Sequence, residues 1–133
     1  MATAKIISFT DLEAWQATHE YRVAVLKLSA TFPSQHKFGL TSQLQRSVIS
    51  IGSNIAEGFG RQGRQEKLQF YRIARGSLVE SQDQLIVARD IGLISQGQFQ
   101  DLANQSIRAH KLINGLLRSL LRTTSSELRF PKT

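Results

Sequence analysis

The chain has 133 residues and carries 17 Lys plus Arg against 10 Asp plus Glu, which gives a net charge of +7. This length suits one domain, 41% hydrophobic residues supply its core, and the absence of cysteine excludes disulfide scaffolds, thiolate metal sites and cysteine catalysis. No apolar run reaches the ~20 residues that span a bilayer, so we expect a cytoplasmic protein with no membrane contact, whose positive charge favours a polyanionic partner.

Hydrophobic residues at helical spacing predict four helices and no strand. The first helix should run from about Asp11 to Phe32 and stop at Pro33, which lacks an amide hydrogen. Its start has the spacing of a capping box, because Thr10 is followed three residues later by Glu13. The apolar positions that share one face of this helix are Leu12, Trp15, Val23, Leu26 and Ala30.

The second helix should run from about Thr41 to Phe59, and the glycine-rich segment Gly58–Gly63 is predicted to be a turn or an irregular helix end. Its apolar stripe consists of Leu44, Val48, Ile51, Ile55 and Phe59. It also carries small side chains, which let helix axes approach closely: Ser47, Ser50, Gly52, Ser53, Ala56 and Gly58. A polar band lies beside the stripe, formed by Ser47, Ser50, Asn54, Glu57 and Arg61. This band either joins helices of one bundle by hydrogen bonds or faces a partner or ligand, and we favour the structural role.

The third helix should run from about Arg64 to Ile91, where Gly92 ends it. The fourth should begin behind Ser95, whose spacing to Gln98 is again that of a capping box, and run to about Arg122. Short connections between such long helices make sequential neighbours antiparallel.

The predicted fold is therefore all-α, an antiparallel up-down-up-down four-helix bundle over residues 10–122. A short N-terminal extension (1–9) precedes the bundle, and a loose basic C-terminal tail (123–133) follows it.

The third helix has more apolar surface than one core face requires. Its predicted core face consists of Leu68, Tyr71, Ala74, Leu78, Leu85 and Ile86. Ile73, Val87 and Ile91 fall on nearly the opposite side. A second apolar stripe on a small bundle indicates contact with another chain, so these three residues form a predicted oligomer interface. The alternative is a few scattered exposed aliphatic residues, which are common.

Arg75 shares a helical face with apolar residues, where an unpaired guanidinium costs several kcal/mol. Glu57 on the second helix is the predicted partner, and together with Asn54 these residues form a predicted structural polar cluster.

Basic residues gather on one side of the fourth helix, at Arg108, Lys111, Arg118 and Arg122. Arg61 and Arg64 at the glycine-rich turn add further cations. Such a surface can bind phosphates, although an ordinary solvated helix face is equally compatible with it. Trp15 and Tyr71 lie on predicted core faces, so we expect binding through charge and shape rather than base stacking.

No residue pattern indicates an enzyme. His19, His36 and His110 are isolated, and none forms a metal-binding pair on a helix. We expect His19 and His110 to be hydrogen-bonded core residues. The glycine-rich turn lacks the Lys-Ser or Lys-Thr of a phosphate-binding loop, and no serine sits in Gly-x-Ser-x-Gly. We therefore expect no catalytic residue, no metal and no cofactor.

Four motifs in order resemble one protein family: Asp11-Leu12-Glu13-Ala14-Trp15-Gln16 with His19-Glu20, Gly39-Leu40-Thr41-Ser42-Gln43, Ser53-Asn54-Ile55-Ala56-Glu57-Gly58-Phe59-Gly60-Arg61, and Ile73-Ala74-Arg75-Gly76-Ser77-Leu78-Val79-Glu80. Over about residues 9–121 the chain is similar to the bacterial four-helix-bundle proteins called 23S rRNA intervening-sequence proteins. Some are encoded within large-subunit rRNA genes, and relatives are accessory variability determinants of diversity-generating retroelements.

The resemblance implies a homopentameric ring of bundles with a basic surface and no catalytic residue. For the retroelement relatives it implies binding of nucleic acid and a reverse transcriptase. Two positions depart from the family pattern. Gly52 stands where a proline is frequent, which predicts a straighter helix, and Gly63 stands where a serine or threonine cap is usual, which weakens the third helix by a few tenths of a kcal/mol.

The leading hypothesis is a non-enzymatic oligomer that binds RNA or DNA with little sequence specificity. The alternative is an oligomeric scaffold or accessory subunit whose partner is another protein.

Overall fold

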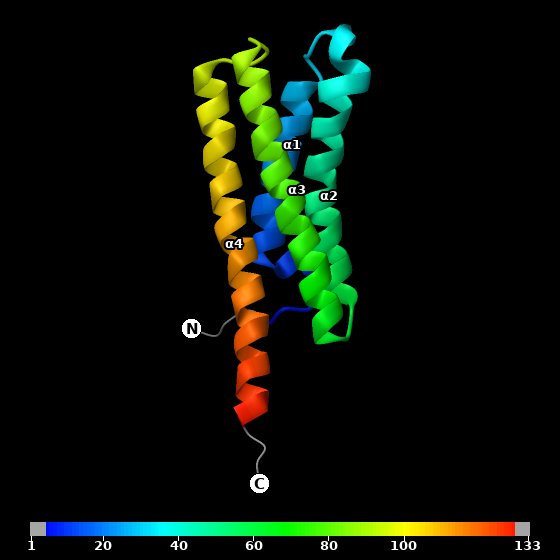
Figure 1. Cartoon of the computed structure of the whole chain (residues 1–133), viewed down its shortest axis with the longest axis vertical. Helices are drawn as coiled ribbons and strands as arrows, with labels where there is room; N and C mark the ends of the chain where they lie inside the picture. The colour runs from blue at the N-terminus through cyan, green and yellow to red at the C-terminus, as the bar shows by residue number, and fades with distance from the viewer. Residues whose placement is uncertain (1–4, 130–133) are drawn as a thin grey trace.

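A computed structural model of the protein describes residues 5–129, with the side chains of residues 5–122. Within this range the chain forms four α-helices and no strand: α1 (Glu13–Ser29), α2 (Ser42–Gly60), α3 (Arg64–Asp90) and α4 (Gln96–Arg129). The helices lie lengthwise beside one another (Figure 1). Three short helices precede α1 and α2: η1 (Phe9–Asp11), η2 (Ser34–His36) and η3 (Lys37–Thr41). The prediction of an all-α chain with four helices is confirmed.

The predicted capping box at the start of the first helix is wrong. The capping box belongs to η1, where Ser8 Oγ accepts from the Thr10 amide at 3.2 Å and Asp11 Oδ2 accepts from the Ser8 amide at 2.9 Å. The backbone amides of Ser8 and Ile7 both donate to Asp11 Oδ2, and these bonds lower the pKa of Asp11. The extended backbone of Leu12 then separates η1 from α1, and Leu12 contributes no side-chain cap. Two residues with the same spacing, slightly earlier in the chain, therefore compete successfully with the predicted pair.

The face of α1 that enters the core also differs from the predicted one. Its buried residues are Ala14, Ala17, Thr18, Tyr21, Val25 and Ser29. The predicted residues Trp15, Val23 and Leu26 are half-buried on its flank, and Ala30 is exposed. The reason is close packing: small side chains occupy the centre of α1, and the one large residue there, Tyr21, is completely buried.

The predicted apolar stripe of α2 is confirmed at Leu44, Val48, Ile51 and Ile55, which are all buried, while Phe59 is half-buried. Hydrogen bonds join α2 to α3. Ser47 Oγ donates to Gln84 Oε1 at 2.6 Å, and the hydroxyls of Ser50 and Ser77 lie 2.9 Å apart. Part of the polar band of α2 therefore forms hydrogen bonds within the molecule, which is the structural role favoured from the sequence.

The predicted bounds of α3 are confirmed to within a residue, and Gly92 follows it with a positive φ of 86°. Gly63 precedes α3 without a side-chain cap, as its lack of a side chain requires. Five of the six predicted core residues are buried, but Ile86 is 42% exposed because it lines a surface groove between α3 and α4 instead of entering the core. Ile73, Val87 and Ile91 are 40–52% exposed.

The capping box of α4 is confirmed, since Ser95 Oγ accepts from the Gln98 amide at 3.0 Å and Gln98 Oε1 accepts from the Ser95 amide at 2.8 Å. The predicted end at Arg122 is too early, because α4 continues to Arg129 and extends past the neighbouring helices (Figure 1). No proline occurs between Pro33 and Pro131, so the helix has no strong stop signal at Arg122. The rest of the predicted tail lies outside the described residues. None of the described helices is long and apolar enough to cross a membrane.

Candidate nucleic-acid interface

The outer face of α4 carries a row of four cations, here called the basic face: Arg108, Lys111, Arg118 and Arg122. All four residues are exposed, whereas Ile113 and Leu117 on the opposite side of the same helix are buried in the core. From its first to its last residue the basic face extends about 21 Å, at about 1.5 Å per residue. The predicted placement of these residues on one solvent-facing surface is thus what the structure shows.

The charge of the basic face is almost unopposed. Arg108 forms an ion pair with Glu20 of α1 (Nη1 to Oε2, 3.6 Å), but the two side chains are 61% and 73% exposed, so the pair is weak. The sequence contains no Asp or Glu between Asp101 and Glu127. A phosphate that approaches α4 therefore meets several cations and no carboxylate on that helix.

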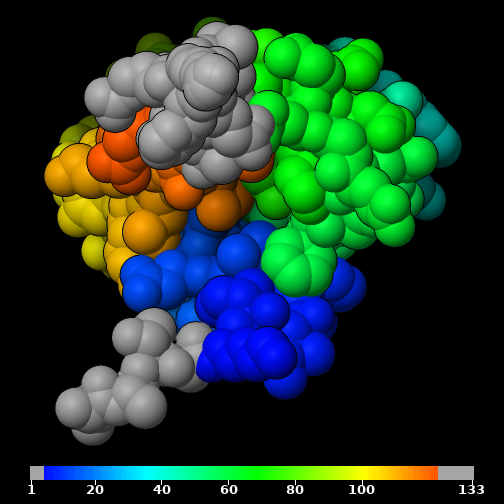
Figure 2. Space-filling model, turned by 90° about the horizontal axis from the view of Figure 1, so that it is seen from below, coloured from blue at the N-terminus to red at the C-terminus, as the bar shows by residue number. Residues whose placement is uncertain are grey.

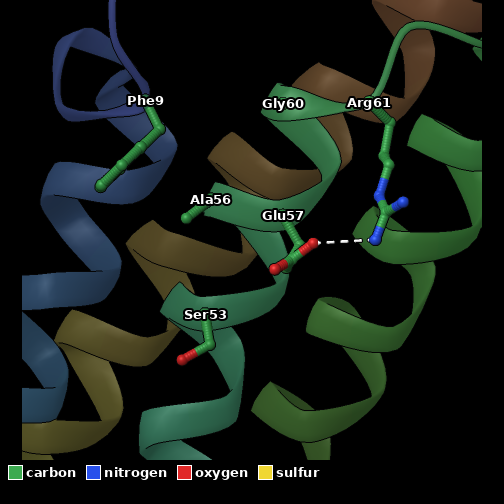
Figure 3. A pocket seen from close by; sticks show the side chains of 6 residues that line it. All are labelled: Phe9, Ser53, Ala56, Glu57, Gly60 and Arg61. Atoms are coloured by element: carbon green, nitrogen blue, oxygen red, sulfur yellow. Dashed lines mark hydrogen bonds and ion pairs between the residues drawn. The ribbon is translucent and has the colours of Figure 1, made fainter.

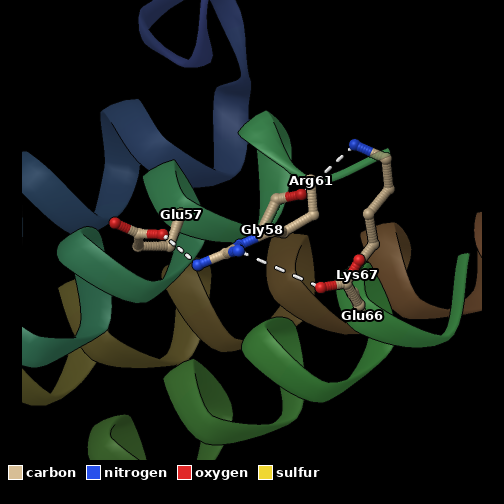
Figure 4. Close-up of polar contacts among 5 residues, drawn as sticks. All are labelled: Glu57, Gly58, Arg61, Glu66 and Lys67. Atoms are coloured by element: carbon tan, nitrogen blue, oxygen red, sulfur yellow. Dashed lines mark hydrogen bonds and ion pairs between the residues drawn. The ribbon is translucent and has the colours of Figure 1, made fainter. Parts of the chain in front are cut away.

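Arg61 lies in a different electrostatic environment. Its guanidinium binds Glu57 (Nη2 to Oε2, 3.0 Å) and lies 3.9 Å from Glu66 Oε2 (Figure 4). It also sits over the Phe70 ring. A phosphate would have to compete with two carboxylates for this side chain, which makes Arg61 a weaker candidate than the residues of α4.

Arg64 is the first residue of α3 and is half-buried. The first turns of α3 and the C-terminal part of α4 lie at the same end of the molecule (Figures 1 and 2). The start of α3 therefore lies at the end of the molecule toward which the basic face runs, although the two groups of predicted residues occupy different helices.

The predicted pairing of Arg75 with Glu57 is wrong. Arg75 Nη1 donates to Asn114 Oδ1 of α4 at 3.0 Å, whereas Glu57 pairs with Arg61 one turn further along its own helix. Asn54 Nδ2 donates within α2, to the backbone oxygen of Ser50 at 2.8 Å. The three residues of the predicted polar cluster therefore do not form one cluster, because Arg75 lies on the side of α3 that faces α4.

A hollow of about 560 Å³ lies between η1 and the C-terminal half of α2 (Figure 3). Phe9 forms one wall, small residues of α2 line it, and Glu57 and Arg61 stand at the other side. Because the Glu57 carboxylate faces this space and neutralises Arg61, the hollow does not favour a phosphate.

A cluster of aromatic and cationic side chains on α1 was not predicted from the sequence. His19 is exposed, not a core residue as predicted, and its ring stacks on that of Trp15 with centroids 4.8 Å apart. Arg22 donates from Nε to His19 Nδ1 at 3.0 Å. The spacing of these three residues at i, i+4 and i+7 was the available signal, since such positions share one helical face. His110, the other expected core histidine, is half-buried.

Among the described residues, no group of three or more His, Asp or Glu is placed to hold a metal ion.

Comparisons with known proteins place the chain among small helical proteins. The sequence model of the 23S rRNA-intervening sequence protein family matches residues 10–115. No curated protein matches the chain. A crystal structure of a protein of unknown function, from the S23 ribosomal protein family of Bacteroides thetaiotaomicron, is similar with a TM-score of 0.74 and 24% sequence identity. That similarity covers 79% of this chain and 95% of the other, and it shows a shared fold.

Proposed function

Because the chain belongs to the family of 23S rRNA-intervening sequence proteins, we propose that it is a non-enzymatic protein that binds RNA or DNA through the basic face of α4. The observation that carries this proposal is the row of four exposed cations on a stretch of helix without any carboxylate. Each phosphate that such a cation contacts releases condensed counterions, which supplies the binding free energy.

Binding of this kind has little sequence preference. Cations on one exposed helix face contact the phosphate backbone, which has the same chemistry at every nucleotide. The expected signature is therefore strong dependence on salt and weak dependence on sequence.

We further propose that the helices form an up-down-up-down bundle and that several copies assemble into a ring. Support for assembly comes from the exposed aliphatic side chains of Ile73, Val87 and Ile91 on α3. The number five rests on the family resemblance alone. Assembly would bring several basic faces together, and each further contact would then be intramolecular, which raises the overall affinity.

The test combines light scattering, for the assembly state, with a salt-titrated mobility-shift assay on RNA and on duplex DNA. In the test variant Arg108, Lys111, Arg118 and Arg122 are all replaced by Gln. On duplex DNA, the slope of log K against log salt should fall by about 0.9 for each phosphate that the variant no longer neutralises.

A control variant with the same loss of charge replaces four exposed cations outside the basic face by Gln: Lys5, Lys37, Arg46 and Arg72. This control should keep most of the slope. Equal slopes for the two variants would show that net charge, and not the basic face, determines binding.

The alternative function is that of a scaffold for another protein. The same exposed aliphatic residues of α3 favour it, because an apolar patch of this kind also suits a protein partner. A stable partner recovered after nuclease treatment, together with no affinity for nucleic acid, would support this alternative.

A further inference from the structure

Three rings form a continuous column on the outside of α1. Phe9 of η1 meets Trp15 edge to face, with centroids 5.2 Å apart and an interplanar angle of 66°. Trp15 and His19 are nearly parallel, at 4.8 Å and 9°. Because Trp15 is half-buried and His19 is exposed, the column begins in the protein and ends in a ring at the surface.

Arg22 holds this column in place and adds a charge to it. It donates to His19 Nδ1 at 3.0 Å and to the Ile49 backbone oxygen at 3.3 Å, and its guanidinium carbon lies 5.6 Å from the centre of the Trp15 ring. Gly52 of α2 makes room for it, since a Cβ at that position would lie 2.7 Å from Arg22 Cζ. Gly52 therefore departs from the family pattern at the position that accommodates the Arg22 side chain.

The positive charge of Arg22 has no carboxylate partner among the described residues. Partial burial lowers the pKa of this guanidinium but leaves it charged at neutral pH. A fixed cation next to an exposed aromatic ring is the combination that binds one nucleotide, with its base on the ring and its phosphate near the cation.

The surface beside the exposed ring of His19 continues to the basic face. A hollow of about 530 Å³ beside His19 is lined by Val23 and Lys27 of α1 and reaches Gln105 of α4. Glu20 also lines this hollow, and its carboxylate is paired with Arg108, the first residue of the basic face. One strand of nucleic acid can therefore contact the ring of His19, Lys27 and the cations of α4 along one side of the molecule.

We propose that the exposed ring of His19 is a stacking site for an unpaired nucleobase, so that the preferred polymer is single-stranded. This inference rests on the proposed function and narrows it. The bases of a duplex are stacked on each other and cannot cover the His19 ring without being unpaired, whereas a single strand offers a free base face at every nucleotide. The site needs no particular base, because all four have a planar π face.

The experiment compares oligothymidylate, which forms no duplex, with double-stranded DNA of the same length. The test variant is His19→Ala, and the conservative variant His19→Phe keeps a ring at this position. The matched control is His36→Ala, which removes the same side chain from η2, away from the column. Trp15 is the only tryptophan of the chain, so its fluorescence reports on the column directly.

Oligothymidylate should change the emission of Trp15 in the wild-type protein. His19→Ala should weaken binding of oligothymidylate about tenfold and leave duplex binding unchanged, because one base–aromatic stack is removed. His19→Phe and His36→Ala should bind both polymers as the wild type does.

Three results would overturn the inference while leaving the proposed function intact: an unchanged affinity of His19→Ala for oligothymidylate, an equal loss for both polymers, or a loss in His19→Phe as large as in His19→Ala. Failure of the wild-type protein to bind either polymer at low salt would instead overturn both proposals.

Discussion

Tyr21 of α1 and Ser81 of α3 are joined by a hydrogen bond of 2.8 Å between their hydroxyl groups, and neither residue is exposed to solvent. Ser81 Oγ uses its own hydrogen to donate to the Leu78 backbone oxygen at 2.7 Å. Tyr21 is therefore the donor in the pair. This buried contact ties together two helices that are not neighbours in sequence.

The two ends of this hydrogen bond should respond differently to mutation. Ser81→Ala leaves the buried Tyr21 hydroxyl without an acceptor and should lower the free energy of unfolding by about 1–3 kcal/mol. Tyr21→Phe removes the donor, but Ser81 keeps its bond to Leu78, so a loss of about 1 kcal/mol is expected. Urea denaturation measures both values. A larger loss for Tyr21→Phe would contradict the assignment of Tyr21 as the donor.

Because Tyr21 is buried, we expect the protein to lose stability at alkaline pH. Burial raises the pKa of Tyr21 from 10.0 to about 12. Between these values the unfolded chain releases the phenol proton and the folded protein retains it, so the free energy of unfolding falls as the pH rises. The total fall is roughly 2–3 kcal/mol. It should be measured as the difference between wild type and Tyr21→Phe, since other groups titrate in both. Parallel stability curves for the two proteins over this range would disprove it.

Gly58 permits the close approach of α2 and α3. A Cβ at this position would lie 2.7 Å from Tyr71 Cε1 and 3.0 Å from Phe70 Cβ. Gly58→Ala should therefore destabilise the protein by about 1–3 kcal/mol, although alanine favours a helix. The matched control is Gly76→Ala on α3, where the new methyl group would have no neighbour within 4 Å apart from the adjacent residues and backbone of its own helix. Thermal denaturation should show the control to be more stable than wild type by about 0.5–1 kcal/mol.

Lys67 caps the C-terminal end of α2 from the start of α3. Its Nζ donates to the backbone oxygen of Gly58 at 3.2 Å (Figure 4) and to that of Phe59 at 2.7 Å. Lys67→Met keeps the apolar stem and removes both bonds, so a loss of about 1–2 kcal/mol is expected in chemical denaturation. Lys111→Met on the exposed side of α4 is the control and should change stability by less than about 0.5 kcal/mol. Equal effects at the two sites would show that Lys67 does not act as a cap.

Helix bounds were predictable wherever a local signal operates. Gly92 ends α3 because it adopts a positive φ, and Ser95 marks the start of α4 because it forms two hydrogen bonds with Gln98, three positions away. The predicted start of the first helix was wrong because Ser8 and Asp11 offer an equally good capping-box pattern. The predicted end of α4 was wrong because a stop signal is missing: Thr123–Leu128 contains neither a proline nor a glycine.

The candidate site was only partly predictable. The basic face follows from the helical repeat alone, because its four residues share one side of a single helix. The partner of Arg75 did not follow, since the choice between Glu57 and Asn114 depends on the rotation of α3 relative to both neighbours. The exposed position of His19 was not predicted, because the buried face of α1 was assigned from its large apolar residues, whereas mostly small side chains occupy that face.

Local sequence signals thus determined where the helices lie in the chain, that there are four of them, and that one of them carries cations along its outer side. Tertiary packing alone decided which side of α1 enters the core, which polar groups meet across helices, and that His19 ends an aromatic column beside Arg22. The physical reason is range: caps, breakers and helical periodicity act within a few residues, whereas the rotation of each helix is set by the volumes of all the side chains that it must pack against.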